Sequence, residues 1–264
     1  MEFRLLGPIE VWAAGHRVRL GDRKQRLILA ILLLEAGQLV PIERIVALVW
    51  SDRPPPSARR TVQAHLSRLR TMLTQSGGER HGVVLLRRGD CYQLSCDRER
   101  IDAHELRRLL ELARQAGDDP TRAVLLDQAL KLWRGPVLAD AGTQENRDRL
   151  GSGLQALRLA AVEERAEVHL RLGHHHLIVD ELSDLAALHP YRQRMTAALM
   201  HAHYAVGDTA TALVVYRRAR QRFTEELGLE PSAELQQLHA AILRGVPAQH
   251  LPLPGAAERS SILL

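Results

Sequence analysis

Short apolar runs separated by turn residues open the chain, before any helical pattern begins. Three such runs lie at residues 3–6, 9–12 and 18–20, with Gly7-Pro8 and Ala14-Gly15-His16 between them. Runs of this length between turn residues predict a small antiparallel sheet. Apolar residues then recur at helical spacing from residue 23 to residue 36, and a glycine at position 37 predicts where this first helix ends.

Prolines bound the next predicted helix. Pro41 suits the first turn of a helix that runs to Trp50, and three consecutive prolines at residues 54–56 interrupt the chain after it. Ser57 is expected to cap a third helix that continues to about Thr74. The pattern of residues 21–74 therefore predicts three helices joined by short connections.

The third predicted helix has two chemically different faces. At 100° per residue, one narrow arc is apolar and should face the core; it contains Val62, Leu66, Leu69 and Leu73. The opposite face contains Arg60, Gln63, Ala64, Ser67 and Thr71, flanked by Arg59, Arg68 and Arg70. Guanidinium, amide and hydroxyl groups are the chemistry that reads base edges in a major groove. A merely solvated helix usually mixes glutamate with arginine, and no acidic residue lies between 57 and 74.

A basic hairpin is predicted to follow this helix. Two apolar segments, residues 83–86 and 91–94, flank a turn that begins with Arg87 and Arg88. A hairpin after a polar-faced helix is typical of a winged helix, whose wing contacts phosphates or a minor groove where arginine is favoured.

The second half of the chain reads as helices only. The helical patterns lie near residues 102–116, 120–133, 145–172, 175–188, 191–206, 208–227 and 231–244, and glycines or prolines separate them. Gly173 and Gly207 stand one tetratricopeptide period apart, which favours three degenerate helix pairs stacked as a short solenoid. We therefore expect a mixed fold: an α+β winged helix at residues 1–96, an all-α tetratricopeptide-like domain at 101–246 and a disordered tail at 247–264.

Charge is distributed unevenly between these regions. The net charge is +5, but residues 1–95 carry 15 basic and 8 acidic residues, whereas residues 96–264 carry 21 and 23. A net +7 on the N-terminal region supplies attraction to nucleic-acid phosphates. No apolar stretch is long enough for a membrane span and no export signal is visible, so we expect a cytoplasmic, nucleoid-associated protein. The two cysteines, Cys91 and Cys96, are expected to be structural.

The sequence lacks the motifs that would indicate an enzyme active site or a cofactor-binding site. There is no phosphate-binding Gly-Lys-Ser/Thr loop and no Gly-x-Ser-x-Gly nucleophile elbow. The run from His174 to His176 is not expected to bind metal, because consecutive helical residues point in different directions. Trp50 and Trp133 are interpreted as core anchors rather than base-stacking groups. We expect no enzyme activity, no cofactor and no metal.

Two blocks of sequence carry a resemblance to a known family. The first comprises Gly21-Asp22-Arg23-Lys24-Gln25-Arg26, Leu48-Val49-Trp50 and the segment from Pro56 to Arg70. The second comprises the segment from Ala129 to Pro136, His189-Pro190-Tyr191-Arg192 and the segment from Glu226 to Pro231. Together they resemble the Streptomyces antibiotic regulatory protein family, the AfsR/DnrI/RedD-type activators, of the small stand-alone type. The first block is similar to the family's OmpR-like winged helix and the second to its bacterial transcriptional activation domain.

The resemblance implies a sequence-specific activator that binds double-stranded promoter DNA. It implies a homodimer on direct repeats near the −35 element, recruitment of RNA polymerase holoenzyme through sigma factor region 4 and neighbouring subunits, and control of antibiotic biosynthesis. The expected DNA-contacting residues are Arg59, Arg60, Thr61, Gln63, His65, Ser67, Arg68 and Arg70 in the helix and Arg87 and Arg88 in the wing. For His65, a half-buried imidazole and a phosphate contact stay equally open. The family's usual wing sequence, Gly-Tyr-Arg-Leu, is replaced here by Cys91-Tyr92-Gln93-Leu94.

Two other functions are compatible with these patterns. One is a protein-interaction adaptor whose tetratricopeptide-like part binds a peptide while the winged helix serves as a docking surface. The other is a repressor with the same DNA contacts and no contact with polymerase.

Overall fold

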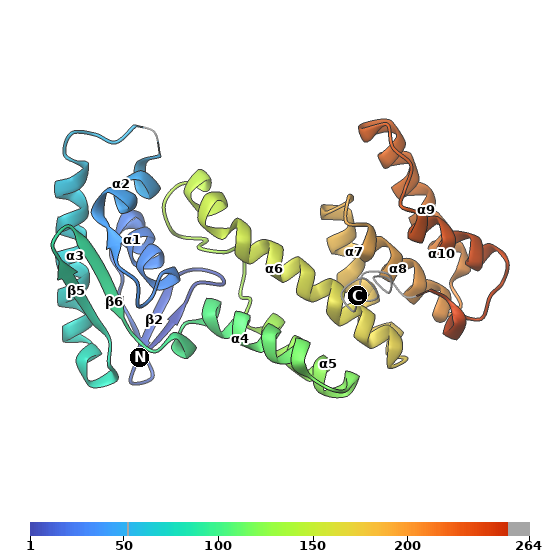
Figure 1. The fold of residues 1–264 in the computed structure, drawn as a ribbon, viewed down its shortest axis with the longest axis horizontal. Coiled ribbons are helices and arrows are strands. Elements are labelled where there is room, and N and C mark those ends of the chain that lie inside the picture. Colours follow the sequence, from blue (N-terminus) through green and yellow to red (C-terminus); the bar gives the residue numbers. More distant parts are fainter. Residues whose placement is uncertain (52, 253–264) are drawn as a thin grey trace, which may run out of the picture. The chain divides into compact units, whose positions relative to one another are not determined.

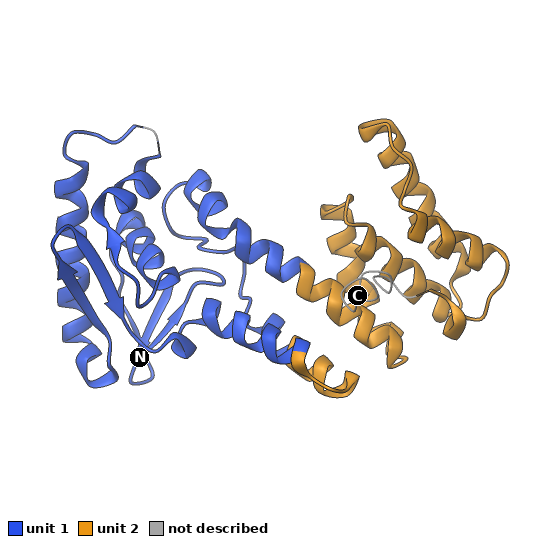
Figure 2. Cartoon of the chain, in the orientation of Figure 1, with its two compact units in different colours: residues 1–114, 127–159 blue, residues 115–126, 160–264 orange. Residues whose placement is uncertain are grey.

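The computed structural model describes residues 1–51 and 53–252 (Figure 1). Contacts group the chain into two compact units, one of residues 1–114 and 127–159 and the other of residues 115–126 and 160 onwards (Figure 2). These units do not coincide with the domains expected at 1–96 and 101–246, because residues 101–114 and 127–159 pack with the N-terminal part. Among the described residues, no helix is both long enough and apolar enough to cross a membrane.

The first unit begins with the predicted three-stranded sheet. Strands β1 (Glu2–Arg4), β2 (Glu10–Ala13) and β3 (His16–Val18) pair antiparallel in the order β1-β2-β3. The register places Phe3 opposite Val11, and both side chains are buried. Burial of alternate residues on one face fixes this register, since a slip by one residue would turn the apolar side chains to water.

Three helices and a second sheet follow, as a winged helix requires. The elements are α1 (Arg23–Leu34), β4 (Val40–Pro41), α2 (Ile42–Trp50), α3 (Ala58–Gln75), β5 (Val84–Arg88) and β6 (Cys91–Ser95), with a 3-10 helix η1 (Gly78–His81) before β5. The sequence predicted the three helices and the β5–β6 hairpin. It did not predict β4, whose two residues pair with β6 at Val40–Tyr92 and Pro41–Cys91.

Helix α4 (Asp102–Gln115) binds the first sheet through its first residue. The backbone N–H groups of Leu5 and Leu6 donate to the Asp102 carboxylate at 2.7 and 3.0 Å. Arg134 lies 3.6 Å from the same carboxylate, and its own backbone N–H donates to the carbonyl oxygen of Leu6. Burial raises the pKa of Asp102, although these amides and Arg134 oppose the shift.

A second carboxylate holds the other side of this sheet. The Asp140 carboxylate accepts a hydrogen bond from the backbone N–H of Ile9 at 2.7 Å and forms an ion pair with Arg26 at 2.8 Å. Near the start of α6 (Gln144–Arg171), the Asn146 side chain donates to the carbonyl oxygen of Leu48. Residues 132–146 are therefore attached to the winged helix within the first unit.

The second unit is helical. It contains the C-terminal part of α6 from residue 160, the first residues of α5 (Asp119–Lys131), and the helices α7 (Val179–Leu188), α8 (Gln193–Ala205), α9 (Thr209–Arg222) and α10 (Ala233–Leu243). Three 3-10 helices, η2 (Arg98–Arg100) in the first unit and η3 (His175–Leu177) and η5 (Ala248–His250) in the second, connect these elements. Helices α7, α8 and α9 pack in sequence as antiparallel neighbours, which agrees with the predicted helix pairs.

Two features near the end of the second unit differ from the sequence prediction. A π-helical turn, η4 (Phe223–Leu227), continues α9 and ends at Gly228, whose φ of 66° suits glycine. Leu251 is buried in the cluster formed by α8, α9 and α10, so residues 247–252 are folded although a disordered tail was predicted from 247. The rest of that predicted tail, residues 253–264, lies outside the described residues.

Candidate nucleic-acid interface

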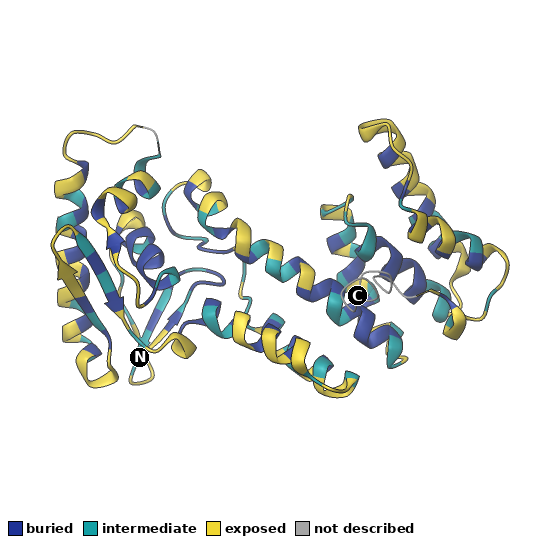
Figure 3. Cartoon of the chain, in the orientation of Figure 1, coloured by how far each residue is buried: buried dark blue, intermediate teal, exposed yellow. Residues whose placement is uncertain are grey.

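Helix α3 separates its apolar and polar residues as the sequence predicted. Its four predicted core residues, Val62, Leu66, Leu69 and Leu73, are all buried. They face α1 and α2, which pack against this side of the helix. The burial pattern in Figure 3 leaves the other side of α3 exposed. The winged helix therefore presents one polar helical surface to its surroundings.

The outward residues of α3 offer hydrogen-bonding groups along the helix. Arg60, Ser67 and Arg68 are exposed, while Thr61 and Gln63 are half-buried at the edge. Within the part of the chain that the structure describes, Arg60 and Arg68 have no hydrogen-bond or ion-pair partner. An unpaired guanidinium can meet a phosphate or the O6 and N7 acceptors of guanine without first breaking a protein contact.

His65 does not belong to this outward surface. Its side chain is 4% exposed, and its Nδ1 atom has no hydrogen-bond partner among the described residues. Burial lowers the pKa of the imidazole, with Arg68 and Lys24 adding to the shift and Asp22 opposing it. Of the two interpretations left open for His65, its burial favours the buried imidazole, and the phosphate contact stays a prediction.

The N-terminus of α3 lacks the cap that the sequence predicted. The Ser57 side chain makes no capping hydrogen bond. Instead, the backbone carbonyl oxygen of Ser57 accepts a hydrogen bond from the Thr61 hydroxyl. The Ala58 N–H donates to the carbonyl oxygen of Pro55 at 2.8 Å, so the N–H groups of Arg59 and Arg60 and the positive end of the helix dipole are left for an anion. Arg60 lies in the same turn and adds positive charge that no described carboxylate pairs with, so this end of the helix is suited to a phosphate.

Arg59 connects three parts of the winged helix. Its guanidinium pairs with Glu43 on α2 and with Asp90 in the β5–β6 turn, and these contacts raise its pKa. Arg59 is among the DNA contacts expected from the sequence, which indicates neither of these partners. No local signal could have done so, because Glu43 and Asp90 are distant in sequence and meet Arg59 only after folding.

The β5–β6 hairpin lies beside α3 and carries the wing arginines (Figure 1). Arg70 of α3 donates to the carbonyl oxygen of Leu85 at 3.1 Å, which ties the helix to β5. Arg87 and Arg88 are exposed, and Arg87 donates to the carbonyl oxygen of Gly89 at 3.0 Å across the turn. Gly89 has a φ of 61°, a conformation that glycine adopts without strain.

The substituted wing position faces the domain. Gln93 donates its side-chain amide to the carbonyl oxygen of Gly37 at 2.6 Å. This bond joins β6 to the end of α1, so Gln93 helps to fix the hairpin on the domain. The basic groups of the wing are then Arg87 and Arg88 at its tip.

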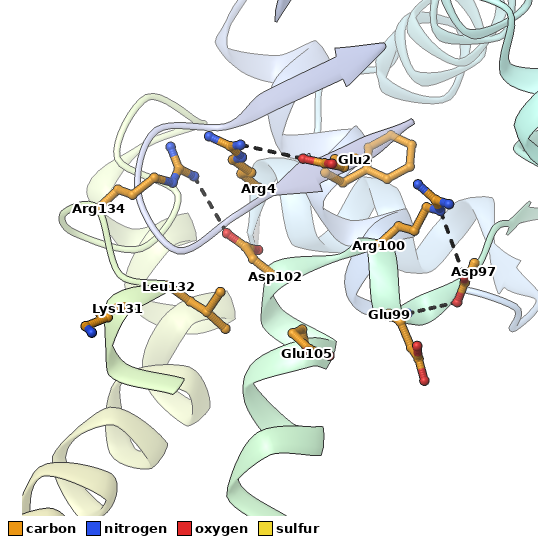
Figure 4. Close-up of a pocket in the computed structure, with 11 residues that line it drawn as sticks. Glu2, Arg4, Asp97, Glu99, Arg100, Asp102, Glu105, Lys131, Leu132 and Arg134 are labelled. Carbon is orange, nitrogen blue, oxygen red and sulfur yellow. Dashed lines mark hydrogen bonds and ion pairs between the residues drawn. The ribbon is translucent and has the colours of Figure 1, made fainter. Parts of the chain in front are cut away.

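A separate hollow of about 540 Å³ in the first unit has a different charge pattern (Figure 4). Three of its basic residues are paired with acids that also line it. The pairs are Arg134 with Asp102 at 3.6 Å, Arg4 with Glu2 at 3.5 Å and Arg100 with Asp97 at 3.9 Å. Compensated charge of this kind gives little attraction to a polyanion, unlike the unpaired arginines of α3.

Both cysteines of the chain lie in the first unit. Cys91 and Cys96 are free, and burial raises the pKa of Cys96 to about 11, which keeps it a thiol at neutral pH. Within residues 1–51 and 53–252, no cluster of three or more histidine, cysteine or carboxylate side chains has the geometry of a metal site.

Known proteins match the chain along nearly its whole length. Residues 15–94 match the family model described as "Transcriptional regulatory protein, C terminal", and residues 101–243 match "Bacterial transcriptional activator domain". The regulatory protein DnrI of Streptomyces peucetius is 33% identical, covering 100% of both chains. The transcriptional regulator RedD of Streptomyces coelicolor is 34% identical over 96% of this chain and 73% of its own.

A solved structure shares the fold. EmbR of Mycobacterium tuberculosis, in complex with a low affinity phosphopeptide, matches with a TM-score of 0.86 and 28% identity. The match covers 99% of this chain and 70% of EmbR. With both family models in order and relatives of this identity over the full length, the chain belongs to the Streptomyces antibiotic regulatory protein family of transcription activators.

Proposed function

We propose that this protein binds specific sequences in double-stranded promoter DNA and activates transcription there. The observation that carries the proposal is the outward face of α3, which is polar and exposed, contains no acidic residue, and bears two arginines with no partner among the described residues. A helical face without acidic residues can approach the DNA backbone with little like-charge repulsion of its own.

In this proposal α3 lies in the major groove and reads base edges. Arg60 and Arg68 suit the paired acceptors of guanine, and Gln63 suits the donor and acceptor of adenine. Thr61 and Ser67 retain hydroxyl lone pairs for base donors, since the Thr61 proton is given to the Ser57 carbonyl oxygen. Each good paired contact contributes about 1–3 kcal/mol of discrimination against the wrong base.

Phosphate contacts then set the position of the helix. Arg87 and Arg88 at the wing tip and the uncapped start of α3, which the Arg59–Asp90 pair holds close to the wing turn, supply positive charge beside the reading face. Contacts of this kind hold orientation but carry no sequence information. Arg70 also has a structural role, because its hydrogen bond to the carbonyl oxygen of Leu85 keeps α3 against the hairpin.

Arg59 has a different role from the other arginines in this proposal. Its pairs with Glu43 and Asp90 hold the wing turn against the first turn of α3. Arg59 is therefore a positioning residue for Arg87 and Arg88, and it reaches a phosphate only by leaving its carboxylates. Substituting Asp90 by Asn should loosen the wing and weaken binding to all duplexes alike, which gel-shift titration against two unrelated sequences would measure.

Family membership supports the rest of the proposed function. A homodimer bound to direct repeats would place two copies of α3 on one face of the DNA near the −35 element. The helical domain would contact RNA polymerase holoenzyme, including sigma factor region 4, and the regulated genes would be those of an antibiotic pathway. The protein would then act at the nucleoid.

A salt-dependent binding titration tests the proposal. Fluorescence anisotropy with labelled promoter fragments from the neighbouring genome region is compared with scrambled fragments at several salt concentrations. We expect preference for one fragment at about 0.15 M salt, with log K falling linearly in log salt. Equal affinity for every duplex would contradict the proposed function.

Transcription in vitro separates an activator from the two alternatives. With purified polymerase and the preferred promoter, an activator raises transcript yield, whereas a repressor with the same DNA contacts lowers it. An adaptor would leave the yield unchanged and would show no preference among duplexes in the titration.

A further inference from the structure

The second unit has a small groove whose residues take no part in the proposed DNA contacts. It lies among α7, α8 and α9, with a volume of about 140 Å³. Its apolar lining comes mainly from Ala186, Pro190, Leu199 and Val215, and none of the ten lining residues is acidic. The groove is thus an apolar hollow on a helical surface with no negative charge of its own.

Two arginines border this groove. Arg218 and Arg222 are one turn apart on α9, and both are exposed. In the region the structure describes, neither one has an ion-pair or hydrogen-bond partner. By contrast, Arg220 on another face of the same helix is bound to Glu230 at 2.9 Å. Arg218 and Arg222 therefore present uncompensated positive charge at the edge of an apolar surface.

The size of the groove restricts what it can hold. Sites for cofactors and drug-sized molecules usually enclose about 300–1,000 Å³, so 140 Å³ is too small for them. A volume of this order suits one apolar side chain of a larger partner, as when an amphipathic helix places an anchor residue in a groove.

The hydroxyl groups of the groove argue against a free inorganic anion. Ser183 donates its hydroxyl proton to the carbonyl oxygen of Val179 at 2.8 Å, and Thr196 donates to that of Arg192 at 3.4 Å. Both hydroxyls therefore offer lone pairs to a ligand rather than donors. A peptide can supply N–H donors to these oxygens while its carboxylates meet the arginines.

We propose that the groove bordered by Arg218 and Arg222 docks an acidic amphipathic peptide segment of a partner protein. One apolar side chain of the segment enters the hollow, and aspartate or glutamate on either side pairs with the two arginines. The proposal does not depend on the DNA-binding function, since it concerns residues on the second unit only.

Selection from a peptide library tests this chemistry without assuming the partner. A phage-displayed library of random dodecapeptides is selected against the full chain, and the enriched peptides are labelled for fluorescence anisotropy. We expect a consensus with at least two carboxylates beside one leucine, isoleucine or phenylalanine. The double variant Arg218→Glu/Arg222→Glu should weaken binding of these peptides by about tenfold or more.

Two further variants separate charge from shape. Ala187→Trp fills the groove without changing charge and should also weaken peptide binding by about tenfold. Arg217→Glu changes an exposed arginine of the same helix that does not line the groove, and its effect should stay within about twofold. Circular dichroism confirms that each variant keeps its helical content.

Promoter binding is measured on the same variants, so that failure here is distinguishable from failure of the DNA-binding proposal. We expect unchanged promoter affinity in Arg218→Glu/Arg222→Glu. A basic or purely apolar consensus, no enrichment over a protein-free selection, equal peptide affinity for the double variant, or loss of promoter affinity in it would each overturn the proposal.

Discussion

Helices α3 and α9 are alike in sequence and differ in their surroundings. Each contains four arginines and no acidic residue. In α3 one arginine, Arg59, is paired with Glu43 and Asp90, and the helix lies next to a hairpin with two more exposed arginines, so unpaired positive charge is present on both elements. In α9 one arginine is bound to Glu230, and two others border an apolar groove. On the two proposals made above, each acid-free helix would meet an anionic partner, and the neighbouring elements would decide which kind.

The largest expected effect in this comparison concerns the packing that fixes the α3 face. Leu66 is 1% exposed, and Leu66→Ala removes buried methyl groups and leaves a cavity, which costs about 2–5 kcal/mol. Urea unfolding followed by tryptophan fluorescence measures this loss, since all three tryptophans lie in the first unit. Ala64→Ser on the exposed side is the matched control and should change stability little. Unchanged stability in Leu66→Ala would mean that this side of α3 is not its packed side.

Low pH should destabilise the second unit through His201 on α8, the helix next to α9. Burial, with a smaller contribution from His175, lowers the pKa of His201 to about 4 from an ordinary value of 6.5. The unfolded chain then binds the proton more readily, so stability is fully present above about pH 6.5 and decreases as the pH falls towards 4. The shift corresponds to about 3 kcal/mol.

Two probes distinguish the units in this acid titration. Far-UV circular dichroism reports helices of both units, whereas tryptophan fluorescence reports the first unit alone. Burial also lowers the pKa of His65 and of His104 in the first unit. We expect loss of helical signal before loss of native fluorescence, and a flatter pH dependence of unfolding in His201→Gln. The same slope in His201→Gln and wild type would refute this assignment.

A smaller free-energy difference is expected for base preference, which should depend on α3 and not on α9. Arg68→Ala should reduce the difference between specific and scrambled duplexes by about 1–3 kcal/mol. Arg217→Ala on α9 is the matched change and should leave that difference unaltered. Anisotropy titrations at constant salt measure both. If Arg217→Ala relaxed base preference as Arg68→Ala does, the contrast between the helices would disappear.

A weaker effect is expected at the wing. Arg87→Ala should lower affinity for all duplexes alike and reduce the slope of log K against log salt by about 1. The salt series of anisotropy titrations provides this slope directly. Discrimination against one base pair by Arg87 would instead assign the wing to sequence reading.

The smallest effect concerns the exposed pair of Arg220 and Glu230. Exposed ion pairs contribute little to stability because solvent screens them, so Arg220→Ala should leave the urea midpoint within experimental scatter. Without Arg220, the Glu230 carboxylate should compete with the carboxylates of a bound peptide for Arg218, which would slightly weaken peptide binding. Peptide anisotropy on Arg220→Ala measures this, and no change would show that Glu230 is too distant to compete.

Elements bounded by glycine or proline could be predicted from sequence because their causes are local. Helix α3 was predicted over 57–74 and is found at Ala58–Gln75. The turn before β6 was predicted between the two wing segments and is found at Gly89 and Asp90. Periodicity and turn chemistry act over a few residues, so they can be recognised before the fold is known.

Features that depend on tertiary contacts could not be predicted in this way. The burial of His65 depends on α1, which covers an edge that the helical wheel left open. Strand β4 contains two residues and exists only because β6 pairs with them. The predicted Ser57 cap is absent because Ser57 has helical backbone angles, φ −84° and ψ 0°, rather than the extended conformation of a capping residue. The DNA-contacting residues themselves remain a prediction that the titrations test.

The attachment of residues 132–146 to the first sheet has a consequence for fragments of this protein. A fragment cut at residue 96 would retain every residue proposed to touch DNA and lose both Asp102 and Asp140. The amides of Leu5 and Ile9 would lose their acceptors, and the apolar side chains of the sheet would meet water. Asp102 and Asp140 thus complete the hydrogen bonding of the winged helix from outside residues 1–96, so a fragment or a chimera that is to keep this sheet intact should include residues up to 146.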